Sequence, residues 1–310
     1  MKTRSITEGA MLSAITVILT IIGEYVGLPA LIIPVPLILL VFRHGYRLGI
    51  TMSVASAVVA SLIAGHVGSG VTIIIWGFLG IALGMALREN FSFFKTLLVG
   101  VAANLVVIGL NVFFYSLIFG ANIFEDFLEM FSSALEDITS LYQSLGATSE
   151  MLAQMEAMRT TFTLLIDWGL PGLLLTSSVF MTFINLAVVR LILRRMGTNI
   201  PWVRPFAEWR LPGWLAILFL GSLILMGVGG TEGGLLPRIG LNLILILMPA
   251  YLIAGISLGW FYFDRWRIPV ILRIIFLYLA LFNGLVLYAV VLAAMVDSVY
   301  SLRRPVAEEK

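Results

Sequence analysis

The sequence is dominated by apolar stretches long enough to cross a lipid bilayer. A hydrocarbon core about 30 Å thick needs roughly 20 apolar residues of helix, at about 1.5 Å rise per residue. The chain of 310 residues is 60% hydrophobic and 12% charged, and a soluble fold of this length cannot bury so much apolar surface. The apolar runs are continuous rather than alternating, which favours helices over a β-barrel. We predict an all-α, polytopic transmembrane helix bundle.

Nine stretches of the sequence are predicted to cross the membrane, with eight as the alternative count. The second stretch is short and rich in proline, so we expect it to be broken or only partly inserted. The sixth is long enough to tilt or to project beyond the bilayer. The predicted ranges are 7–27, 29–42, 48–66, 70–88, 95–119, 163–193, 212–230, 236–262 and 270–296.

Basic residues gather on one side of this predicted topology. With the N-terminus in the cytoplasm, fourteen lysine and arginine residues fall inside and five outside, as expected because cytoplasmic loops of membrane proteins are enriched in them. Arg303 and Arg304 fall outside and break the pattern, so either nine spans is wrong by one or the tail is an exception. We predict a bacterial inner-membrane protein with a cytoplasmic N-terminus, and leave the side of the C-terminus open.

The predicted spans divide the chain into three regions. Residues 1–195 form a first bundle that includes a helical hairpin outside the membrane at 121–161, 196–211 form a cytoplasmic interfacial loop, and 212–310 carry three further spans. In the hairpin, apolar residues recur at helical spacing and acidic residues occupy the other faces, which indicates an amphipathic helix. We expect this hairpin to cover the protein's own bundle or to bind a partner.

Ionisable side chains within a bilayer are costly, and they therefore mark candidate sites. In the predicted topology, four such residues lie at or near the outer ends of four different spans. Each one alone is explained by a solvated helix end, whereas together they suggest a shared cavity for a solute. These candidate ligand-binding residues are Glu24, His66, Asp167 and Glu232. The glycine-rich stretch 65–70 is predicted to be a tight connection rather than a phosphate cradle.

Two further groups of residues are candidates for helix packing or partner contacts. Small residues allow helix backbones to approach closely, and they are also used in contacts with partner helices; here they are Ala10, Ala14, Gly77, Gly80 and Gly84. Tryptophan and arginine in a short loop suit the headgroup zone of the membrane or a docking site for a cytoplasmic protein. These loop residues are Trp202, Arg204, Trp209, Arg210 and Trp214.

The sequence contains no recognisable enzymatic motif. There is no HExxH, Gly-x-Ser-x-Gly or P-loop pattern, and the two histidines, His44 and His66, are predicted to lie on opposite sides of the membrane. The absence of cysteine excludes disulfides and thiolate metal ligands. We predict no catalytic residues, no metal and no cofactor, with an intramembrane hydrolase as the remaining enzymatic alternative. The net charge of +2 and the lack of a basic stripe argue against nucleic acid as a partner.

Motifs in both halves of the chain resemble known membrane proteins. The C-terminal third carries Phe206–Trp214, Asn242, Ala254–Ile256, Pro269 and Asp297 followed by Arg303–Arg304, and in these it resembles the YybS-like family of uncharacterised bacterial membrane proteins. The N-terminal part carries Glu8–Ala14, a proline-rich second span, Arg43–Gly45 and Arg47–Gly49. In these it is similar to the S-components of energy-coupling-factor vitamin transporters.

The second resemblance implies a solute-binding bundle of six spans whose first helix meets a coupling subunit through Ala10 and Ala14. The three further spans and the outer hairpin depart from that plan. We therefore predict small-solute binding or transport, with a non-transporting scaffold or assembly protein as the alternative. The scaffold would recruit partners through the outer hairpin or the loop at 197–214. The lipid bilayer is the expected environment, and a protein partner within it is left open.

Overall fold

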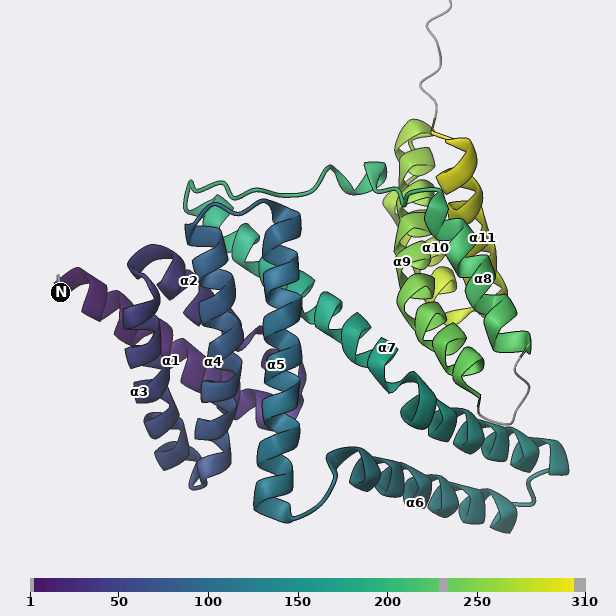
Figure 1. Ribbon diagram of the computed structural model, residues 1–310, viewed down its shortest axis with the longest axis horizontal. Coiled ribbons are helices and arrows are strands. Elements are labelled where there is room, and N and C mark those ends of the chain that lie inside the picture. Colours follow the sequence, from purple (N-terminus) through teal and green to yellow (C-terminus); the bar gives the residue numbers. More distant parts are fainter. Residues whose placement is uncertain (1–2, 229–233, 304–310) are drawn as a thin grey trace, which may run out of the picture. The chain divides into compact units, whose positions relative to one another are not determined.

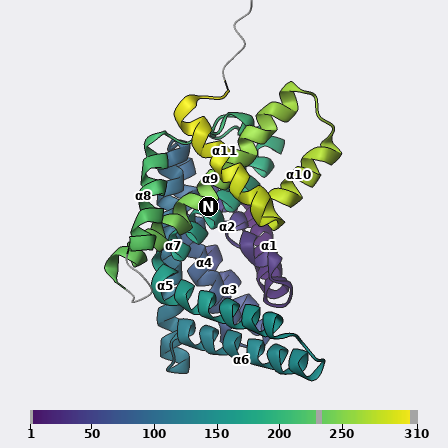
Figure 2. The ribbon, with the colours of Figure 1, turned by 90° about the vertical axis from the view of Figure 1, so that its right-hand side faces the viewer.

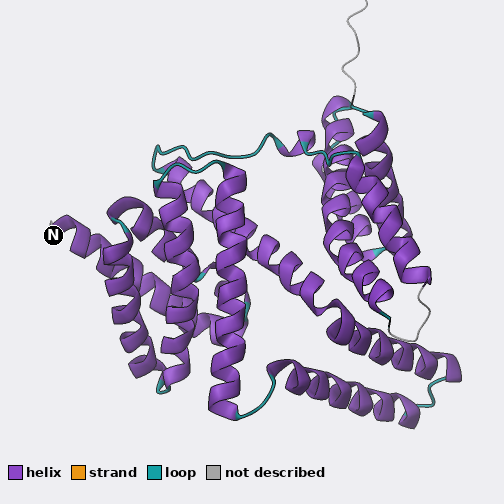
Figure 3. Cartoon of the chain, in the orientation of Figure 1, coloured by secondary structure: helices purple, strands orange, loops and turns teal. Residues whose placement is uncertain are grey.

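The computed structural model describes residues 3–228 and 234–303, and every regular element in these ranges is a helix (Figure 3). The predicted all-α architecture is therefore confirmed. The chain forms two compact units (Figure 1): unit 1 comprises Met1–Glu136 and Ser177–Trp202, and unit 2 comprises Asp137–Thr176 and Val203–Lys310. The units divide within helices rather than at the ends of the predicted spans, because two helices contribute residues to both.

Unit 1 contains five complete α-helices and a short 3₁₀ helix. They are α1 (Thr3–Val26), η1 (Leu28–Ile32), α2 (Pro34–His44), α3 (Tyr46–Ala64), α4 (Val67–Arg88) and α5 (Phe93–Phe119). Two helices are shared between the units, α6 (Ile123–Ser144) and α7 (Ser149–Arg195). The complete elements of unit 2 are η2 (Phe206–Glu208), α8 (Trp214–Val228), α9 (Leu235–Arg265), α10 (Val270–Phe282) and α11 (Gly284–Tyr300).

Six of the described helices, α1, α3, α4, α5, α7 and α9, are long and apolar enough to cross a membrane. Two predicted spans, near 29–42 and 212–230, correspond to shorter apolar helices at Leu28–His44 and Trp214–Val228. The ninth predicted span, 270–296, is not one helix. It consists of α10 and α11, whose axes are bent by 100°.

The proline-rich second stretch is buried inside unit 1. Every residue from Pro34 to Val41 is buried, and α1, α3 and α4 all pack against α2. Proline is tolerated in the first turn of a helix, where its missing N–H would have no partner in any case. The 3₁₀ helix η1 itself has no buried residue, so the buried part of this stretch begins at Ile33.

Two glycines of α4 allow this close packing. A Cβ atom on Gly80 would lie 2.9 Å from Leu37 Cβ, and one on Gly84 would lie 2.6 Å from Val41 Cβ. Both distances are shorter than side chains tolerate, so α4 approaches α2 at glycine positions alone. The sequence pattern at Gly77, Gly80 and Gly84 thus corresponds to a helix contact within unit 1.

An ionic cluster fixes the direction in which α2 runs. Glu8, near the start of α1, pairs with Arg43, and its Oε2 lies 2.9 Å from His44 Nε2 at the end of α2. The start of α1 and the end of α2 therefore lie at the same end of unit 1. Because η1 folds back beside Gly23 at the other end of α1, η1 and α2 together return along α1.

The predicted amphipathic hairpin corresponds to α6 and the beginning of α7. The end of α6 lies beside the beginning of α7 in both views (Figures 1 and 2), and Thr139 Oγ1 donates to Met155 Sδ at 3.4 Å. Gly146, in the turn between them, has φ +80°, a conformation that favours glycine. The second helix does not stop before the membrane stretch, since α7 continues without interruption for 47 residues.

Candidate functional site

Three polar side chains meet where α1 ends and α4 begins. Ser69 Oγ donates to Glu24 Oε1 at 2.6 Å. His66 Nε2 lies 3.5 Å from Glu24 Oε2 and 3.5 Å from Ser69 Oγ. The Ser69 residue is fully buried, whereas the His66 and Glu24 side chains are 56% and 28% exposed. The cluster thus has a buried anchor and an accessible outer edge, and it brings together two of the four predicted ligand-binding residues.

The local backbone explains why these side chains converge. Gly65 ends α3 with φ +76°, His66 is extended, and α4 begins at Val67. Ser69 therefore lies in the first turn of α4, whose unpaired N–H groups favour a nearby carboxylate. Gly70 follows directly, and a Cβ atom there would lie 2.7 Å from Ala57 O. Close packing of α3 and α4 holds Ser69 in place beneath Glu24.

The geometry suits solute contact better than nucleophilic catalysis. In a nucleophilic site the serine is accessible and donates to a histidine base. Here the Ser69 residue is buried. Its hydroxyl donates to the Glu24 carboxylate at 2.6 Å, whereas His66 Nε2 is 3.5 Å away from the same hydroxyl oxygen. The second carboxylate oxygen and the imidazole ring are left at the accessible edge. Together they can accept hydrogen bonds from a polar solute or balance a positive charge on it.

Unit 1 also contains a polar interior between α5, α7 and η1. Asn185 of α7 is fully buried, and its Nδ2 donates to Leu31 O of η1 at 3.0 Å. A close approach of Gly100 to Thr182 brings α5 and α7 together. Three buried oxygen atoms have no hydrogen-bond partner: Asn104 Oδ1, Thr182 Oγ1 and Asn185 Oδ1.

These orphaned oxygen atoms lie deep in the bundle. Asn185 precedes the end of α7 by ten residues and Asn104 follows the start of α5 by eleven, which corresponds to about 15–17 Å along each helix. Both residues thus lie well inside their helices, away from the helix ends. Buried polar groups are normally satisfied by protein, water or a ligand, and unsatisfied ones inside a membrane bundle are candidates for contact with either.

In unit 2, a side chain of α9 bridges a break in the backbone hydrogen-bond ladder of α7, which remains helical on both sides of it. Pro171 lies within α7 and has no N–H to donate. Gly172 N donates to Asn242 Oδ1 at 2.6 Å, and Asn242 Nδ2 donates to Trp168 O at 2.6 Å. One amide side chain therefore supplies both partners for the interrupted turn. A side chain inserted into the helical hydrogen-bond ladder is, like proline, a recognised cause of a helix kink.

The two other predicted ligand-binding residues are Asp167 and Glu232. Asp167 is exposed on the segment of α7 that belongs to unit 2, next to Trp168 at the break. Glu232 lies outside the described residues. Ala10 and Ala14 are exposed on α1 next to exposed Met11 and Ile15. A lipid-facing surface and a partner-binding surface would both have this composition.

The five predicted loop residues fall into both units. In unit 1, Trp202 packs edge-on against Phe93, with ring centroids 5.0 Å apart, and lies beneath the Arg190 guanidinium at 4.6 Å. In unit 2, Trp209 Nε1 donates to Arg204 O at 2.8 Å, and Arg210 donates to Ser298 O at 3.0 Å. Trp214 is 62% exposed at the start of α8, as expected for a tryptophan in the headgroup zone.

Sequence reasoning missed the partners that complete these arrangements. Ser69 lies in the glycine-rich stretch that was interpreted only as a tight connection, and Asn242 was noted without a link to Pro171. A proline in one apolar helix and an asparagine in another are a usable signal, because the broken backbone needs a polar partner. The contacts of Arg303 with Ala207 and Trp209 had no comparable signal, since the predicted topology placed Arg303 on the opposite side of the membrane from these residues.

Comparison with known proteins places the chain among membrane proteins without an assigned activity. The family model described as "Predicted membrane protein (DUF2232)" matches residues 14–298. The chain is also similar to the "Uncharacterized protein YybS" of Bacillus subtilis (strain 168), with 25% identity over 315 residues that cover 98% of this chain and 99% of the relative. No solved structure matches.

Proposed function

The chain belongs to the DUF2232 family of predicted membrane proteins, and from this premise we propose that it binds a small polar solute and carries it through the membrane. The observation that carries the proposal is the cluster of Glu24, His66 and Ser69. A carboxylate anchored from below by a buried hydroxyl, and open on its other side, is preorganised for a ligand. Unlike a solvated helix end, it is held by residues from two helices.

Two features of the interior support transport rather than binding alone. The polar groups of α5 and α7 in unit 1 leave unpaired oxygen atoms buried within the bundle. The backbone hydrogen-bond ladder of α7 is diverted to a side chain next to Pro171, although the helix continues, and the 3₁₀ segment η1 precedes α2. Irregular backbone within apolar segments is a feature of the solute sites of many secondary transporters. The proposed similarity of unit 1 to transporter S-components would give the same role to the accessible end of α1.

Replacing Glu24 with glutamine is expected to abolish solute retention while leaving the fold intact. The amide keeps the size of the side chain and can still accept a bond from Ser69, but it removes the negative charge at the accessible edge. The protein is purified in mild detergent, incubated with the fraction of a cell extract below about 1 kDa, and analysed by native mass spectrometry. Wild-type protein should carry a bound small molecule, and Glu24→Gln should not.

Tyr25→Phe is the matched control, since Tyr25 is 86% exposed on the same helix end and should retain the bound mass. Thermal unfolding should be the same for all three proteins, which separates loss of binding from loss of folding. Equal occupancy in wild type and Glu24→Gln would remove Glu24 from the site. Wild-type protein that carries no small molecule would contradict the proposed function itself.

The amphipathic α6 supports a second candidate function, a scaffold that holds a partner protein. Its exposed apolar side chains include Met130 at 62% and Leu141 at 58%, and acidic residues occupy its first turn. A scaffold would retain a stoichiometric protein, rather than a small molecule, through purification. Loss of that protein in a Met130→Glu, Leu141→Glu double variant would favour the scaffold over the solute carrier.

A further inference from the structure

The last two helices form a sharply bent pair that lies within unit 2. Helices α10 and α11 have 13 and 17 residues, about 20 Å and 25 Å of helix, so each is shorter than a bilayer core of about 30 Å. Their axes differ by 100°. Asn283 lies at the bend, and its side chain accepts a bond from Val286 N at 3.2 Å, which caps α11. The bend is therefore a defined turn in the chain.

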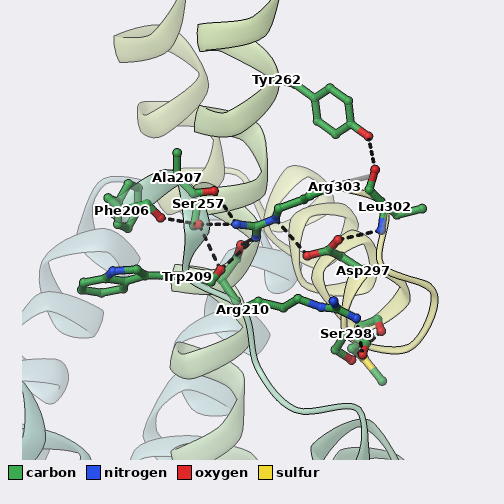
Figure 4. Close-up of polar contacts among 12 residues, drawn as sticks. Phe206, Ala207, Trp209, Arg210, Ser257, Tyr262, Asp297, Ser298, Leu302 and Arg303 are labelled. Carbon is green, nitrogen blue, oxygen red and sulfur yellow. Dashed lines mark hydrogen bonds and ion pairs between the residues drawn. The ribbon is translucent and has the colours of Figure 1, made fainter. Parts of the chain in front are cut away.

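The end of α11 lies beside the segment that precedes α8. Arg303 donates to Ala207 O at 2.5 Å and to Trp209 O at 2.9 Å (Figure 4). Arg210 donates to Ser298 O at 3.0 Å. The contacts are reciprocal: Arg210, before α8, donates to α11, and Arg303, after α11, donates to the segment before α8.

The same end of α11 also lies beside the last turns of α9. Arg303 donates to Ser257 Oγ at 3.0 Å and to Ala254 O at 3.3 Å. Tyr262 Oη donates to Leu302 O at 3.1 Å. Because α9 ends at Arg265 and α10 begins at Val270, the chain enters α10 close to the place where it leaves α11.

We infer that α10 and α11 form a re-entrant hairpin, which enters and leaves the membrane on the face that carries residues 206–210. A hairpin that crossed the bilayer would place Arg303 about 30 Å from Trp209, whereas the two residues are hydrogen-bonded. The chain then has at most two spans after residue 203, the long helix α9 and the shorter apolar helix α8, in place of the three predicted. This inference is independent of the proposed solute site.

The Arg303 guanidinium holds this hairpin closed. Its Nε donates to Asp297 Oδ2 at 3.1 Å, and Asp297 Oδ1 accepts Leu302 N at 2.9 Å. Both side chains are buried, with 10% and 2% exposed. Burial lowers the pKa of Arg303, and the Asp297 carboxylate opposes that shift. Each nitrogen of the guanidinium has at least one acceptor, as a buried arginine requires.

The re-entrant arrangement also removes the exception in the charge pattern. In the nine-span topology, Arg303 falls on the side opposite the basic residues near 204–210 and 265–273. In the re-entrant topology it shares their face. Arginine and lysine flanking membrane helices normally gather on one face, so the charge distribution and the contacts of Arg303 agree.

Labelling of single cysteines tests the topology directly, because the chain contains no native cysteine. Three exposed positions serve as reporters: Glu208 before α8, Gly234 between α8 and α9, and Leu302 after α11. Each cysteine variant is treated with a membrane-impermeant maleimide, in intact spheroplasts and in inverted vesicles. We expect Glu208→Cys and Leu302→Cys to react in the same preparation, and Gly234→Cys in the other.

A fourth variant, Phe282→Cys, tests the depth of the turn. Phe282 is 75% exposed beside the bend, and a re-entrant turn surrounded by lipid should leave it unreactive in both preparations. Reaction of Leu302→Cys together with Gly234→Cys would overturn the inference. Where Leu302→Cys fails to accumulate, a reporter domain fused after Lys310 gives the same assignment, and its appearance on the Gly234 side would likewise overturn it.

Discussion

Replacing Arg303 with leucine is expected to lower the free energy of unfolding by about 3–5 kcal/mol, the cost of breaking a buried ion pair by removing one partner. The substitution leaves the Asp297 carboxylate buried without its counter-charge. It also removes the donors that reach Ala207 O, Trp209 O and Ala254 O. The change can be measured as the shift in thermal unfolding of the detergent-solubilised protein, followed by tryptophan fluorescence.

Arg204→Leu is the matched control for this variant. Arg204 is an exposed arginine on the same segment as Trp209, so its replacement should change stability by less than about 0.5 kcal/mol. The double variant Arg303→Leu, Asp297→Leu leaves no unpaired charge and should be less destabilised than the sum of the two single variants. Strict additivity, or an Arg303→Leu variant as stable as the control, would show that the pair does not hold the hairpin.

Replacing Asn242 with leucine is expected to destabilise the protein by about 2–6 kcal/mol. One side chain satisfies both the Gly172 N–H and the Trp168 carbonyl at the break in α7. Leucine has a similar volume and leaves both groups unpaired, at about 1–3 kcal/mol for each buried polar group. Thermal unfolding of the purified protein measures the effect, and near-ultraviolet circular dichroism reports the packing around Trp168.

Asn111→Leu provides the control, because it is also an asparagine within an apolar helix. Its Nδ2 donates only to Val107 O in its own helix. That carbonyl can still accept a hydrogen bond from the backbone N–H four residues later, so losing the Asn111 side chain should cost less than about 1 kcal/mol. Asn242→Asp keeps the acceptor for Gly172 N and loses the donor to Trp168 O, so this variant should be less stable to thermal unfolding than wild type. Equal stability of Asn242→Leu and Asn111→Leu would show that the break in α7 needs no side-chain partner.

The helices could be predicted from the sequence because their cause is local. Apolar runs of about 20 residues, and the spacing of apolar and acidic residues in α6, are properties of short windows. The proline-rich stretch was expected to be broken, and it is broken at η1. The burial of Pro34–Val41 could not be predicted, because it depends on contacts from α1, α3 and α4 that involve residues far apart in the chain.

The fate of the ninth predicted span illustrates a different limit. Residues 270–296 are mostly apolar, and composition alone cannot distinguish a continuous span from a bent pair of shorter helices. Asn283 marks the bend, but asparagine also occurs inside an unbroken helix, as at Asn104 in α5. What determines the turn is the set of contacts around Arg303, which joins segments more than 90 residues apart.

At the candidate site, too, residues with a local sequence signal could be predicted, and a residue that depends on a tertiary contact could not. Glu24 and His66 were predicted from their charge and from their positions at helix ends, and the structure brings them together. Ser69 was missed because a serine three residues after a histidine is an unremarkable pattern in sequence. Its importance comes from the first turn of α4 facing the last turn of α1, which is a tertiary contact.

Hydrogen exchange is the most direct test of the claim that a solute binds where α1 ends and α4 begins. The protein is compared with and without the extract fraction below about 1 kDa, and exchange is measured peptide by peptide. If a solute binds there, we expect slower exchange in peptides that cover Glu24 and residues 65–70, and no such change in Glu24→Gln. Unchanged exchange there, with protection appearing only in α6 or in residues 203–210, would contradict it.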